Sequence, residues 1–89
     1  MPRIRLPGML QSHVGNVPVV EVEGSSIKEV INNLLDKFPT LQPILTKDGK
    51  LGRNVNVFLG SEDIRFLNNE ETLVKPTDEI HLVPAVAGG

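Results

Sequence analysis

The sequence predicts an α+β domain in which one main helix lies across one face of a mixed sheet of four to five strands. The first observation is a segment, residues 25–39, with the 3.6-residue periodicity of an amphipathic helix. The second is a set of four segments in which apolar and polar residues alternate, as they do in half-buried strands. The third is size, because 89 residues, 39% of them hydrophobic, suffice for a single small core.

The first two alternating segments predict an antiparallel hairpin. Residues 3–6 (RIRL) set two arginines opposite two apolar residues, and residues 19–23 (VVEVE) set two glutamates opposite two valines. Once the strands pair, basic and acidic side chains share the outer face, which favours the pairing. Turn-forming residues mark the connection between the strands: Pro7, Gly8, Gly15 and Pro18.

The helix has the clearest pattern in the chain. Its apolar residues recur at intervals of three and four and line one face: Ile27, Val30, Ile31, Leu34, Leu35 and Phe38. Ser26 and Glu29 have the spacing of a capping box, in which each side chain binds a free amide of the first turn. Pro39 lacks an N–H and disfavours helical backbone at Phe38, so the helix is expected to end there.

Two more strands are expected after a turn-rich connection at residues 40–53. Residues 54–60 (NVNVFLG) alternate, so the residues on the inner face are Val55, Val57 and Leu59. Residues 62–78 form a short extended piece with turns. Residues 79–84 (EIHLVP) alternate again, with Ile80 and Leu82 facing inward.

This order of strand, strand, helix, strand, short strand and strand predicts a β-grasp arrangement. The last strand returns beside the first and runs parallel to it, which requires a crossover that the helix supplies. The expected organisation is a domain over residues 1–84 and an extended, flexible tail over residues 85–89.

Composition excludes several classes of function. A net charge of −2, three Phe and no Tyr or Trp argue against a nucleic-acid partner. The absence of cysteine excludes a disulfide framework, a thiolate metal site and a Cys nucleophile. No apolar run reaches the roughly 20 residues of a membrane span, and no signal-peptide segment is apparent, so a cytoplasmic protein without membrane contact is expected.

Catalytic and metal sites are not indicated by the polar residues. His13 and His81 are not at metal-ligand spacing and no pair of carboxylates accompanies either, so both are interpreted as surface histidines and no metal site is predicted. The acidic segments at residues 60–63 and 68–71 are interpreted as solvated turns because neither has the spacing of a calcium-binding loop.

The outer sheet face carries an apolar interruption. Phe58 and Val83 break otherwise polar outward rows on strands that the predicted sheet can place side by side. Together with His81 they would form an exposed patch, and contiguous apolar patches tend to mark binding partners. The alternative explanation is that these apolar side chains lie under a loop and are not exposed.

The segment AVAGG at residues 85–89 follows Pro84, which ends the last strand by removing a hydrogen-bond donor. Five extended residues reach roughly 17 Å from the domain. A frayed end is one interpretation. The other is a device that inserts a C-terminal carboxylate into a partner's active site, because glycine permits close backbone approach and an extended peptide binds along a groove.

The segments TDEIHLVPAVAGG and NVNVFLGSEDIRFL resemble the ubiquitin-like sulfur carriers of the MoaD/ThiS family. The resemblance implies that an ATP-using, ubiquitin-activating-type enzyme adenylates the C-terminal Gly89, which then becomes a thiocarboxylate and donates sulfide. Gly88, which has no side chain, precedes it and lets it enter the active site of the partner. The resemblance further implies that the chain is a protein co-substrate rather than an enzyme and that it binds no cofactor. The residues expected to contact partners are Phe58, His81, Val83, Pro84, Ala85, Val86 and Ala87.

The resemblance leaves the acceptor open between two branches. The ending VPAVAGG is similar to the carrier that supplies a pyridoxal-phosphate cysteine synthase. Small subunits of molybdopterin synthase usually carry a second proline where this chain has Ala85, so that branch comes next. Two other classes of function stay open, a ubiquitin-like modifier joined to lysines and a non-covalent β-grasp interaction module that does not need its glycines.

Overall fold

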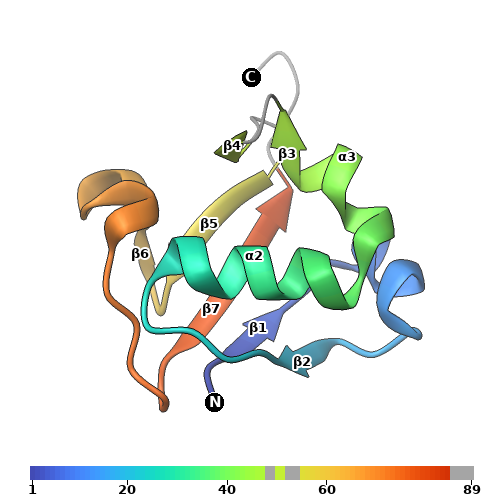
Figure 1. Cartoon of the computed structure of the whole chain (residues 1–89), viewed down its shortest axis with the longest axis horizontal. Coiled ribbons are helices and arrows are strands. Elements are labelled where there is room, and N and C mark those ends of the chain that lie inside the picture. The colour runs from blue at the N-terminus through green and yellow to red at the C-terminus, as the bar shows by residue number, and fades with distance from the viewer. Residues whose placement is uncertain (48–49, 52–54, 85–89) are drawn as a thin grey trace.

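The computed structural model describes residues 1–47, 50–51 and 55–84, and within this part of the chain a five-stranded sheet is covered on one face by helix α2 (Figure 1). The strand order is β2-β1-β7-β5-β6. The strands span Val19–Glu21 (β2), Arg3–Arg5 (β1), Glu79–Pro84 (β7), Val55–Leu59 (β5) and Glu62–Asp63 (β6). The predicted mixed sheet is confirmed, since β1 pairs antiparallel with β2 and parallel with β7, and β7 pairs antiparallel with β5.

Helix α2 spans Ile27–Lys37 and begins at the predicted N-cap. The Ser26 hydroxyl accepts the backbone N–H of Glu29 at 3.2 Å. The other half of the capping box was predicted wrongly, because the Glu29 carboxylate accepts both the backbone N–H and the hydroxyl of Ser25, each at 3.0 Å. The helix ends before Pro39 as expected, and the Phe38 N–H donates to the carbonyl of Leu34 at 2.8 Å.

The two long connections contain helical turns that the sequence analysis did not predict. The segment between β1 and β2 forms α1 (Gly8–Gln11) and a 3₁₀ turn (Ser12–Val14), which bury Leu10 and Val14. The segment expected only as a connection at residues 40–53 includes elements of its own: part of a 3₁₀ turn (Pro39–Leu41), α3 (Gln42–Leu45) and the strands β3 (Thr46–Lys47) and β4 (Lys50–Leu51). These turns add apolar residues to the core.

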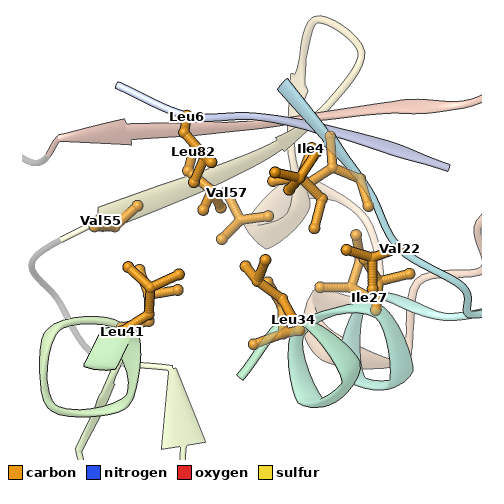
Figure 2. Packing of buried hydrophobic residues seen from close by; sticks show 14 of the residues in the cluster. Ile4, Leu6, Val22, Ile27, Leu34, Leu41, Val55, Val57 and Leu82 are labelled. Carbon is orange, nitrogen blue, oxygen red and sulfur yellow. The ribbon is translucent and has the colours of Figure 1, made fainter. Parts of the chain in front are cut away.

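The core lies between the sheet and α2. Figure 2 shows Ile4, Leu82 and Val57 of the sheet pointing toward Leu34 and Ile27 of the helix. The alternation predicted for the strands is confirmed, because their inward residues are buried, except Leu59, which is half-buried against the core, and their outward neighbours are exposed or half-buried. At roughly 25 cal/mol per Å² of apolar area removed from water, this layer is the main source of folding free energy.

The short extended piece predicted within residues 62–78 is β6, and the segment that follows it forms a lobe. It contains two 3₁₀ turns, Ile64–Phe66 and Asn69–Glu71. The interpretation of the acidic turns as solvated holds for Glu62 and Glu71 but is wrong for Asp63, which is buried. Burial of that carboxylate is possible because the Arg65 guanidinium pairs with it at 2.8 Å.

Candidate functional site

The tail leaves the domain from a central strand. β7 lies between β1 and β5, and its last residue, Pro84, is paired with Val55 and exposed. Pro84 is the last described residue of β7. Residues 85–89, which include the predicted site residues Ala85, Val86, Ala87, Gly88 and Gly89, lie outside the described residues.

The three outer-face residues singled out from the sequence come together beside this exit. Phe58 lies directly across from His81 in the β5–β7 ladder, and Val83 lies across from Asn56. Phe58 and Val83 are therefore diagonal neighbours, about 7–8 Å apart between Cα atoms. Val83 is 39% exposed, whereas Phe58 and His81 are half-buried, so the patch is more sheltered than the sequence suggested.

A polar network joins this patch to β1. The Arg5 Nε donates to the Glu79 Oε1 at 3.0 Å, and the His81 Nε2 lies 3.1 Å from the same oxygen. The predicted sharing of the outer face by basic and acidic residues is confirmed, since Arg3 lies across from Glu21, whereas Arg5 lies across from Val19 and pairs with Glu79 of β7. Sequence reasoning missed this contact because its partners are 74 residues apart, although the alternation had placed both on the outer face.

The charges around Glu79 keep its carboxyl group ionised. The hydrogen bond from Arg5 lowers the pKa of Glu79, and the nearby charges of Arg5, His81 and Arg3 act in the same direction. The three basic side chains come from two neighbouring parallel strands whose register places Arg3 opposite Glu79 and Arg5 opposite His81. The carboxylate thereby holds together the polar half of the face.

We define the docking face as the outward-facing side chains of β1, β7 and β5. The polarity of these side chains changes along the strands. Arg3 and Glu79 lie at the end where β7 begins, Phe58 lies level with His81, and Val83 lies next to Pro84, from which the tail leaves. A charged border beside an apolar centre is typical of protein interfaces. The face therefore presents one apolar residue close to the tail and a second one beside the polar network.

Catalytic chemistry is not indicated on the docking face, which has no nucleophile next to a base. His13 contacts Thr40 through Nδ1 and Oγ1 at 3.1 Å, so within the described residues it is used to tie two connections together. In the same ranges no group of three or more metal-ligating residues could hold an ion. None of the described helices is long and apolar enough to cross a membrane.

Comparison with known proteins gives consistent matches over the whole domain. The profile of the ThiS family matches residues 4–89. The sulfur carrier protein CysO of Mycobacterium tuberculosis is 32% identical, and the match covers 97% of this chain and 96% of that protein.

Two solved structures show the same architecture. A chain in the crystal structure of the Amycolatopsis orientalis BexX/CysO complex has a TM-score of 0.89 and 34% identity, with 100% of both chains covered. The solution structure of the small archaeal modifier protein 1 from Methanosarcina acetivorans has a TM-score of 0.88 and 29% identity, covering 99% of this chain and 95% of that one. These matches confirm the ubiquitin-like β-grasp fold and the resemblance to the sulfur carriers.

Proposed function

This chain belongs to the ThiS family, and from that premise we propose that it is a sulfur carrier whose Gly89 carboxylate is adenylated and converted to a thiocarboxylate. The names of its relatives support the carrier role, since CysO is a sulfur carrier protein that matches nearly the whole chain. The structural observation that carries the proposal is the exit of the tail from the central strand β7, beside the docking face.

The tail sequence suits this chemistry. A carboxylate is a poor acyl donor until its oxygen attacks the α-phosphorus of ATP and pyrophosphate leaves. A sulfur nucleophile at the hydrosulfide level then adds to the carbonyl carbon of the acyl adenylate and AMP leaves, which yields the thiocarboxylate. Gly88 and Gly89 have no Cβ, so the backbone can approach the nucleotide closely.

Partner proteins supply the ATP site and the acceptor for the sulfide. The ATP site belongs to a ubiquitin-activating-type adenylating enzyme, and a biosynthetic enzyme accepts the sulfide. We assign the docking contact to Phe58, His81 and Val83, while Pro84 to Ala87 lie extended in the partner's groove. The BexX/CysO complex supports docking of this fold on partner proteins.

The acceptor that we favour is a pyridoxal-phosphate cysteine synthase. The ending VPAVAGG and the similarity to CysO proteins support this branch. The large subunit of molybdopterin synthase is the next candidate acceptor, with this chain then acting as the small subunit. Ala85 in place of a second proline disfavours that assignment.

A second candidate function is conjugation to lysines of other proteins. The similarity to the small archaeal modifier protein 1 favours it, because the described domain is shared over almost its full length. Both functions begin with an activated C-terminal glycine, so they diverge only at the nucleophile that attacks the acyl group.

The test incubates the full chain with ATP, a sulfide source and the purified adenylating enzyme, followed by intact-mass measurement. We expect a gain equal to the difference between a sulfur and an oxygen atom, located at Gly89. A chain that lacks Gly88 and Gly89 is the matched control and should gain nothing. No mass gain in the full chain, with lysine-linked conjugates on a denaturing gel of the cell extract, would instead favour the modifier function.

A further inference from the structure

The lobe formed by residues 62–73, here called the β6 lobe, exposes more apolar side chain than any other part of the described chain. Phe66 is 82% exposed and Leu73 is 77% exposed, and Leu67 is also exposed. Single exposed apolar residues are common on protein surfaces. Three of them within eight residues, with an aromatic ring as the most exposed, form a concentrated apolar feature outside the docking face.

A carboxylate holds the Phe66 turn in one conformation. Asp63 accepts the backbone N–H of Arg65 at 2.9 Å, which caps the 3₁₀ turn, and it accepts the Arg65 Nη2 at 2.8 Å. Between these residues Ile64 is buried in the core, and the Leu67 N–H donates to its carbonyl at 2.9 Å. The hydrogen bond from Arg65 lowers the pKa of Asp63, so the pair stays charged at neutral pH.

The far end of the β6 lobe is fixed as well. The hydroxyl of the buried Thr72 accepts the Asn68 N–H at 3.0 Å, and the Thr72 carbonyl accepts the N–H of Ile27 at 2.9 Å. The lobe is thus anchored to the start of helix α2, beside which Figure 1 places it. An aromatic side chain on such a rigid support loses little backbone freedom on binding, which is the condition for an interface hot spot.

The charges of the β6 lobe indicate which surface would receive it. Arg65 is neutralised by Asp63, and the exposed charged residues of the lobe that remain are acidic: Glu62 and Glu71. A second copy of the chain would bring like charges together and is disfavoured. The complementary surface is an apolar pocket bordered by Lys and Arg.

We propose that Phe66 is a second docking anchor that inserts into such a pocket on the adenylating enzyme, an inference that rests on the proposed function. The lobe adjoins the docking face because Asp63 pairs directly with Phe58 across β6 and β5. The adenylation step calls for contacts of this kind, since the tail brings an anionic carboxylate against the triphosphate. Binding energy from the folded domain has to offset that repulsion.

The experiment measures ATP–pyrophosphate exchange by the purified adenylating enzyme at increasing concentrations of the full chain. Phe66→Ala should raise the KM for the chain about tenfold with kcat unchanged, because the anchor contributes the same binding energy before and during the adenylation step. The matched control is Met9→Ala, which removes a side chain that is 58% exposed on α1, and its KM should stay at the wild-type value.

A charge variant tests the character of the pocket. Glu71→Lys should raise the KM at low salt, and the difference from the wild type should shrink as salt increases, because exposed charges are screened.

If Phe66→Ala keeps the wild-type KM while exchange still requires Gly89, the docking role of Phe66 is overturned and the carrier function stands. If the wild-type chain supports no exchange, the proposed function fails and the anchor fails with it. An equal rise in KM for Met9→Ala would also overturn the anchor.

Discussion

The two faces of the sheet are built from alternate residues of the same strands yet have opposite properties. On the inner face Ile4 and Ile80 are neighbours in the β1–β7 ladder and both are fully buried beneath α2. One residue farther along each strand, Arg5 and His81 are neighbours on the outer face, linked through one oxygen of Glu79.

Within the same three short strands, the inner face contributes stability and the outer face is available for recognition. Apolar burial scales with area, so substitutions on the inner face act mainly on the free energy of unfolding. Exposed ion pairs contribute little to that free energy because water screens them. The outer face can therefore carry a docking surface whose residues are replaceable without loss of the fold.

The largest expected effect comes from breaking the inner face. Ile80→Ala should lower the free energy of unfolding by about 2–5 kcal/mol, because it removes a fully buried side chain and leaves a cavity. The adjacent outer-face variant His81→Ala is the control and should cost less than about 1 kcal/mol. Urea unfolding of both variants measures the difference, and equal losses would contradict the division of roles.

The next effect in size concerns recognition. Phe58→Ala should raise the KM for the chain in ATP–pyrophosphate exchange about tenfold, and Val83→Ala by less, with kcat unchanged for both. Val17→Ala is the control for Val83→Ala, because both side chains are 39% exposed but Val17 lies in the connection before β2. A normal KM for Phe58→Ala would remove the docking role of the face.

The smallest effect is a dependence of stability on pH. The pKa of Glu79 is lowered in the folded state, so its stabilising effect is complete above the ordinary value of 4.5 and is lost as pH falls through the folded value. Glu79→Gln should therefore be less stable than the wild type near pH 7, and the two unfolding curves should converge as pH falls through the folded pKa of Glu79. The gap at neutral pH should narrow in high salt. Curves that stay parallel from pH 7 to pH 2.5 would assign the effect to packing.

The docking face could be predicted only in part. Alternation alone placed Phe58 and Val83 on one face, and the structure brings them together with His81. The sharing of Glu79 between Arg5 and His81 was not predictable, because it depends on the parallel register of strands far apart in the chain. The role of Gly89 remains a proposal, since the tail lies outside the described residues.

The sequence by itself determined the elements whose signals are local. Helix α2 follows from its periodicity and its Ser26 cap, and the inward parity of the strands follows from their alternation. The tertiary structure decided the rest. Leu10 and Leu41 enter the core from turns too short to show a period, and the contact between Arg5 and Glu79 joins strands that lie 74 residues apart in the chain. Such features depend on contacts and burial that form with the whole domain, so no local pattern of residues contains them.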